Sequence, residues 1–89
     1  MKDKIRKIRE SKGYNRTEFE EITGVLAKTW ANIELGKQKA NEDHLKAITN
    51  VWPEFALWLL TDQTIPEAGQ ISPEIEEARR SQNLRTGTN

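Results

Sequence analysis

The side chains of this chain that can do binding chemistry are mostly cations and amides, and they gather in its first half. Residues 1–40 contain ten Lys and Arg against six Asp and Glu, whereas residues 41–89 contain four against eight. The 89-residue chain has a formal net charge of zero, but its N-terminal part is basic. A basic segment of this kind favours an anionic partner.

The chain offers few residues suited to catalysis, because it contains one His and no Cys. The composition excludes thiol nucleophiles, disulfides and Cys-based zinc sites. His44 has no evident acid or nucleophile to act with and is interpreted as a polar residue at a helix start. We therefore expect no enzyme, no metal, no cofactor and no small-molecule ligand. The absence of Cys, of an apolar leader and of a long apolar run favours a cytoplasmic protein without a membrane span.

Helical periodicity runs through the chain, and no segment alternates apolar and polar residues long enough to predict a strand. Gly13, Gly24 and Gly36 mark helix ends, and Asn15 and Asn41 are good N-caps. The pattern predicts an all-α protein, a compact five-helix bundle with helices over residues 3–12, 16–23, 27–35, 42–51 and 53–61. Apolar stripes on these helices predict a core that includes Phe19 and Ile22.

Composition also predicts a division of the chain near residue 61. Residues 1–61 contain every Phe, Trp and Tyr, and residues 62–89 are mostly polar. We expect a domain over 1–61 and a C-terminal extension over 62–89. Within the extension, Ser72-Pro73-Glu74 has the order of a helix start, which predicts a short sixth helix over about 73–81. Residues 82–89 are expected to be loose.

Residues 15–36 have the spacing of a helix-turn-helix, with a tight turn at Gly24. In such a motif the second helix enters the major groove of DNA. Further matches lie on both sides: Ile5-x-x-Ile8-Arg9, Gly13, Glu18-Phe19, Thr23-Gly24-Val25, Ile33-Glu34-x-Gly36-Lys37 and Trp58-Leu59-Leu60. On these residues, 4–61 resemble the helix-turn-helix domain of lambdoid phage repressors and Cro proteins, the xenobiotic-response-element (XRE) family.

The resemblance implies a lambda-repressor-like fold and a sequence-specific DNA-binding regulator of transcription, a phage or prophage repressor. Asn can pair with adenine, Lys can donate to guanine, and a small apolar side chain can meet a thymine methyl. The positions that match DNA-contacting positions of the family, at the start of the first motif helix, along the second and in the loop after it, are Arg16, Ala27, Lys28, Thr29, Asn32, Lys37 and Lys39.

The resemblance also makes structural expectations. Arg9 and Glu34 match residues that pair between two helices in the family, which predicts a structural ion pair. Leu26 stands where the family usually has Ser or Thr, so the helix over 27–35 is expected to lack a side-chain cap. Glu20 replaces a small residue between the two motif helices, and it must turn outward or force them apart.

For assembly, we expect a homodimer on a palindromic operator. Residues 51–60 are unusually apolar, and side chains off the inner stripe predict a dimer interface at Trp52, Leu57 and Leu60. The other interpretation is that Trp52 and Leu57 complete the monomer core. Another class of function also stays open: a protein-binding module on the same fold, such as an antitoxin or a small phage factor that engages a host protein. Such a module would expose apolar residues such as Leu26, Leu35 or Trp52.

Overall fold

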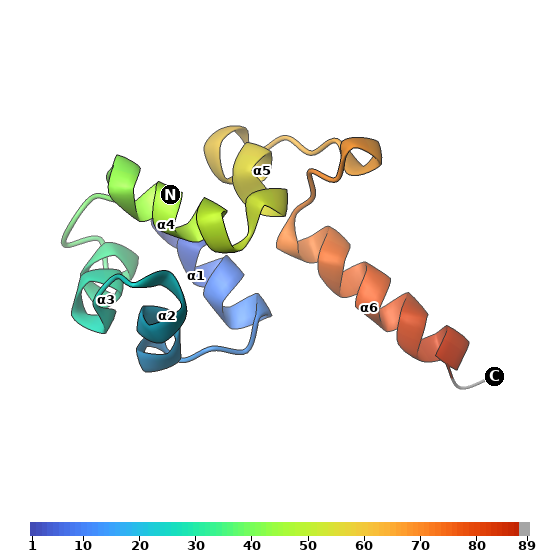
Figure 1. The fold of residues 1–89 in the computed structure, drawn as a ribbon, viewed down its shortest axis with the longest axis horizontal. Helices are drawn as coiled ribbons and strands as arrows, with labels where there is room; N and C mark the ends of the chain where they lie inside the picture. Colours follow the sequence, from blue (N-terminus) through green and yellow to red (C-terminus); the bar gives the residue numbers. More distant parts are fainter. Residues whose placement is uncertain (88–89) are drawn as a thin grey trace.

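The computed structural model describes residues 1–87 of the chain, with side chains described for residues 1–82. All its regular elements are helical, as Figure 1 shows, and the prediction of a small all-α bundle is confirmed. The elements are α1 (Lys2–Ser11), α2 (Arg16–Thr23), α3 (Ala27–Glu34), α4 (Glu42–Val51), the 3₁₀ turn η1 (Pro53–Phe55), α5 (Ala56–Thr61), the 3₁₀ turn η2 (Pro66–Ala68) and α6 (Pro73–Gly87).

The core is formed where the first helices meet the end of α4 and the start of α5. Its members are the buried apolar side chains Ile5, Ile8, Phe19, Trp30, Ile33, Ile48, Trp52, Phe55, Leu59 and Ile71. Ile22 of α2 was expected on this inner face, but its side chain is exposed. A single residue of that short helix, Phe19, is therefore buried, and it lies against Trp30 of α3 with ring centroids 5.0 Å apart.

Trp52 is a core residue, and the expectation that it faces a partner chain is wrong. Only 8% of its surface is exposed, and its ring stacks on Phe19 with centroids 5.6 Å apart and planes 13° apart. The expectation counted Trp52 among the apolar side chains of residues 51–60 that lie off the inner stripe. In the structure α4 ends at Val51, and the bend before Pro53 turns Trp52 inward. Leu57 is half-buried, while Leu60 is 62% exposed.

The segment after α5 is attached to the bundle just before α6 begins. Ile71 is buried and its backbone N–H donates to the carbonyl of Glu54 at 2.9 Å. α6 then packs on α1, where Lys12 pairs with Glu76 at 2.9 Å and Lys7 pairs with Glu74. The sixth helix of the extension therefore packs on α1.

The far end of α6 extends away from the bundle (Figure 1). The helix begins at Pro73, as predicted, but it continues to Gly87 instead of ending near residue 81. Residues 82–87 are therefore helical, residues 88–89 lie outside the described part of the chain, and a loose end stays a prediction. The sequence after 81 contains no proline and reaches its first glycine at Gly87, so no residue type forces an earlier end.

Candidate nucleic-acid interface

The helix-turn-helix begins at a well-formed cap on α2. The Asn15 side chain accepts a hydrogen bond from the Glu18 N–H at 2.8 Å, and the Asn15 N–H donates to the Glu18 carboxylate at 2.9 Å. At the other end, Gly24 adopts a left-handed conformation with φ of 79°, which a residue with a Cβ rarely adopts. α2 therefore begins after Asn15 and ends before Gly24, as the sequence predicts.

Thr23 fixes the two motif helices to each other. Its hydroxyl donates to the Phe19 carbonyl at 2.6 Å and accepts a hydrogen bond from the Trp30 indole N–H at 3.0 Å. The bulky ring of Trp30 is thus held both by packing on Phe19 and by a polar contact across the turn. These contacts set the position of α3 on the bundle.

Glu20 caps α3 from the preceding helix, which neither expectation for this residue included. Its carboxylate accepts a hydrogen bond from the backbone N–H of Ala27 at 2.7 Å. Leu26, at the N-cap position, supplies no side-chain hydrogen bond. A carboxylate is stabilising at the positive end of a helix. Glu20 therefore supplies the N-terminal cap that Ser or Thr at position 26 would otherwise provide.

One buried carboxylate ties α3 to the two helices before it. The Glu34 side chain is 1% exposed and receives two hydrogen bonds of 2.9 Å from the Arg9 guanidinium. The structure thus brings together the two residues expected to pair. The hydrogen bond and charge of Glu34 raise the pKa of Arg9, against an opposing effect of burial. Arg9 also donates to the Tyr14 carbonyl at 2.9 Å.

Arg16 is the second cation on the same carboxylate. Its Nη2 lies 3.2 Å from Glu34, and its side chain is 40% exposed. Its Nε is buried without a hydrogen-bond partner among the described residues. Two arginines on one carboxylate leave one positive charge uncompensated at the start of α2. Arg16, expected only as a phosphate contact, therefore has a structural partner as well.

The cations of the molecule divide into two groups. Among the described side chains, most Lys and Arg residues of α1, α4 and α6 form ion pairs. The cations with no ion pair or hydrogen bond in the described part of the chain are Lys2, Lys28, Lys37, Lys39 and Arg79. All of these except Arg79 belong to α3, to the loop after it, or to the start of α1, which adjoins that loop.

The remaining expected contact residues lie on or beside α3. Lys28 is exposed, and Ala27, Thr29 and Asn32 are half-exposed. The Asn32 side chain has no hydrogen bond within the described residues. Its backbone carbonyl, in contrast, accepts from the N–H groups of Lys37 at 2.9 Å and Gln38 at 3.2 Å. The loop carrying Lys37 and Lys39 is thus fixed directly to the helix carrying Lys28 and Asn32.

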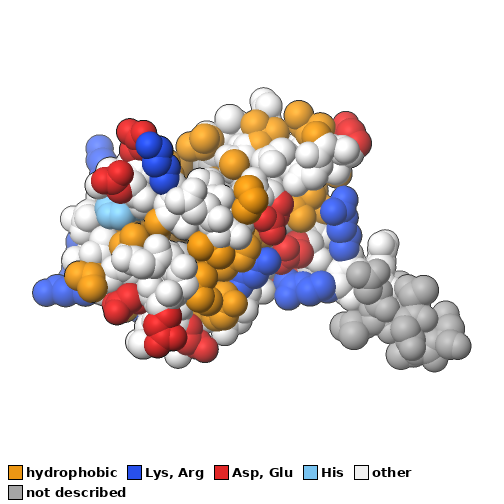
Figure 2. Space-filling model, viewed as in Figure 1, with side chains coloured by type: hydrophobic (Ala, Val, Ile, Leu, Met, Phe, Trp, Pro, Cys, Tyr) orange, Lys and Arg blue, Asp and Glu red, His pale blue; other side chains and the backbone are white. Residues whose placement is uncertain are grey.

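Acidic and apolar side chains border this basic surface. Figure 2 shows acidic side chains gathered over α2, whose exposed carboxylates include Glu18 and Glu21. Leu26 and Leu35, at the two ends of α3, are 63% and 61% exposed. The surface around α3 therefore combines unpaired cations with two exposed leucines.

Other kinds of site receive no support from the described residues. Within that part of the chain, no group of three His, Cys, Asp or Glu is arranged to hold a metal ion. None of the described helices is long and apolar enough to cross a membrane. His44 has a structural place, since its Nδ1 accepts from the Asn41 N–H at 3.0 Å and completes the cap of α4.

The fold and this motif define a phage-repressor type of helix-turn-helix protein, and comparison with known proteins agrees. No model of a known protein family matches the chain. Over 75 residues it is 32% identical to Repressor protein C of Escherichia phage P2, a match that covers 82% of this chain and 76% of that protein. The chain belongs to the family of this phage repressor. Membership of the XRE family stays a prediction.

The buried cluster on Glu34 yields a first prediction. Arg9→Met and Glu34→Leu should each lower the free energy of unfolding by about 3–5 kcal/mol, because the first leaves the buried Glu34 carboxylate with only the half-exposed Arg16 and the second leaves the Arg9 guanidinium without its carboxylate. The double variant should lose much less than the sum, with Arg16 free to turn outward. Urea unfolding measures all three. The control is Glu42→Leu on the exposed pair with Lys46, expected to change stability by under about 1 kcal/mol. Additive losses in the double variant would reject the pairing.

The cap on α3 yields a second prediction. Glu20→Ala should cost about 1 kcal/mol of stability, and Leu26→Ser added to it should recover most of that loss by restoring an ordinary N-cap. Thermal unfolding of the single and double variants measures the recovery. Glu21→Ala is the matched control, because Glu21 is exposed and makes no hydrogen bond within the described residues. Equal behaviour of the Glu20 and Glu21 variants would rule out the cap.

Proposed function

We propose that this protein is a transcriptional repressor that binds double-stranded DNA with α3 in the major groove. The observation that carries the proposal is the group of unpaired cations on α3 and its following loop, in a molecule whose other cations are largely paired. Relationship to a phage repressor supports it. A cation already paired with a carboxylate gains less from a phosphate, so the unpaired lysines are the ones available to DNA.

The proposed contacts follow from side-chain chemistry. Lys28 donates to guanine O6 and N7, and Asn32 pairs with adenine, while Ala27 meets a thymine methyl. Thr29 reaches a phosphate or a base edge. Arg16, Lys37 and Lys39 bind phosphates and set the register of α3 in the groove. Repression then follows from occlusion of a promoter by the bound protein.

We further propose that the protein binds as a homodimer on a palindromic operator. One helix-turn-helix contacts one half-site, and specific affinity usually comes from two half-sites about 34 Å apart. Trp52 belongs to the core, so the proposed interface now rests on Leu60, with Leu57 at its edge. Ile65, just before η2, is another exposed apolar side chain after α5.

A second function is favoured by one specific observation. Leu26 and Leu35 are both largely exposed at the ends of α3, as expected of a module that binds another protein. In that case α3 would present a face to a protein partner instead of DNA. The experiment below separates the two, since a protein-binding module would enrich no DNA sequence.

DNA recognition is tested by selecting bound duplexes from a random pool at physiological salt. We expect one sequence pattern to be enriched. Lys28→Ala and Asn32→Ala should each weaken binding to it by about 1–3 kcal/mol and relax the preference at one base pair. Lys46→Ala, an exposed lysine of α4 that pairs with Glu42, is the control and should bind as the wild type does. If no sequence is enriched, or if the Asn32 variant keeps both affinity and preference, the α3 assignment is wrong.

The dimer is tested by sedimentation at tens of micromolar protein without DNA. The wild type should sediment with twice the chain mass, and Leu60→Glu should reduce it to the monomer mass, because it places a charge in an apolar contact. Leu35→Glu is the matched control, since Leu35 is equally exposed but lies at the end of α3, away from the proposed interface. A wild-type monomer at all concentrations would defeat the dimer proposal.

A further inference from the structure

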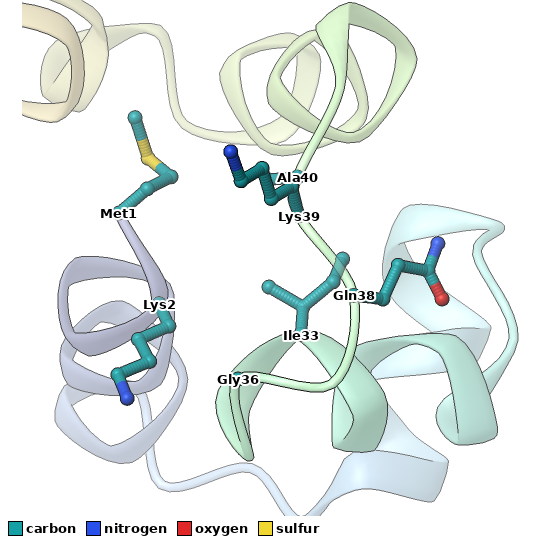
Figure 3. Close-up of a pocket in the computed structure, with 7 residues that line it drawn as sticks. All are labelled: Met1, Lys2, Ile33, Gly36, Gln38, Lys39 and Ala40. Atoms are coloured by element: carbon teal, nitrogen blue, oxygen red, sulfur yellow. The ribbon is translucent and has the colours of Figure 1, made fainter.

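A hollow beside the end of α3 is not explained by the contacts proposed so far. Its volume is about 490 Å³, and it lies between the start of α1 and the loop that joins α3 to α4. Figure 3 shows Met1 and Lys2 on one side of it and Lys39 and Ala40 on the other. The buried side chain of Ile33 lies between them and forms the floor.

The charge of the hollow is positive and uncompensated. Lys2 and Lys39 both line it, no acidic side chain does, and neither lysine has an ion pair within the described residues. Gln38 also lines the hollow, but its amide points away from it (Figure 3). In contrast, the next lysines of α1, Lys4 and Lys7, pair with Asp62 and Glu74.

The Lys2 side chain lies close to Gly36, at the start of the loop. A Cβ added at Gly36 would lie 3.3 Å from the Lys2 Nζ, and Gly36 has φ of +79°. The ammonium group therefore lies over the backbone at the point where α3 ends and the basic loop begins. Two segments far apart in sequence, α1 and residues 36–40, thus each bring one lysine to the rim of the hollow, Lys2 beside Gly36 and Lys39 on the side of Met1 (Figure 3).

We propose that this hollow binds a phosphodiester of the DNA backbone, with Lys2 and Lys39 as its two cations. Lysine binds phosphate as a point charge, and the apolar floor suits the sugar next to the phosphate. The inference rests on the proposed function, because the hollow adjoins the loop whose Lys37 is assigned to the same backbone. It adds α1 to an interface otherwise formed by α2, α3 and the loop.

The test is the salt dependence of binding to a random-sequence duplex, which measures phosphate contacts without knowledge of the operator. Each lost phosphate contact should reduce the slope of log affinity against log salt concentration by about 0.9. Lys2→Gln and Lys39→Gln should each show this reduction. Arg79→Gln is the matched control, because Arg79 is an exposed cation of α6, also without an ion pair in the described part of the chain. It should keep the wild-type slope.

The outcomes separate this inference from the proposed function. If the wild type binds with a steep slope but Lys2→Gln behaves as Arg79→Gln does, the hollow is not a phosphate site, although DNA binding stands. If the wild type binds no duplex at any salt concentration, the proposed function fails and this inference fails with it. Thermal unfolding of each variant should match the wild type, because these side chains are exposed and unpaired, so a loss of slope reports the contact and not the fold.

Discussion

The carboxylate of Glu34 is the interaction on which the arrangement of this protein most depends. It is buried at the end of α3 and holds Arg9 of α1 and Arg16 of α2 at once. A buried charge is costly unless its hydrogen bonds are satisfied, so this group specifies one relative placement of three helices. The Thr23 and Glu20 contacts then fix the other end of α3. α3 is consequently a short helix of eight residues held at both ends by polar contacts and along its inner side by Trp30 and Ile33.

The same placement explains how a neutral chain can present a basic surface. Carboxylates at the end of α5 and on α6 pair with Lys4, Lys7 and Lys12, so these lysines are neutralised within the fold. The pairing leaves α3 and its loop with cations that have no partner in the described part of the chain. Folding therefore concentrates the available positive charge beside one helix, where an elongated polyanion can meet it. Two exposed leucines flank that helix, and they adjoin the charge without neutralising it.

Much of the fold could be predicted because local signals agree with one another. Asn15, Gly24 and Asn41 set helix ends by backbone chemistry that does not depend on distant residues. Other features depended on tertiary contacts. Trp52 lies in a bend, where helical periodicity does not apply, and Glu20 caps a helix that begins seven residues later. Lys2 gave no signal, because it comes to lie beside the loop after α3 only when α1 packs there. The pairing of Arg9 with Glu34 came from a family resemblance and not from the pattern of residues.

The DNA-binding surface assigned to the unpaired cations around α3 can be tested by the change in backbone amide NMR shifts when a duplex selected by the protein is added to it. We expect changes concentrated at residues 27–32 and 36–39, with residues 74–82 of α6 unaffected. Changes centred on Leu60 and Ile65 or on α6, with α3 unaffected, would contradict it.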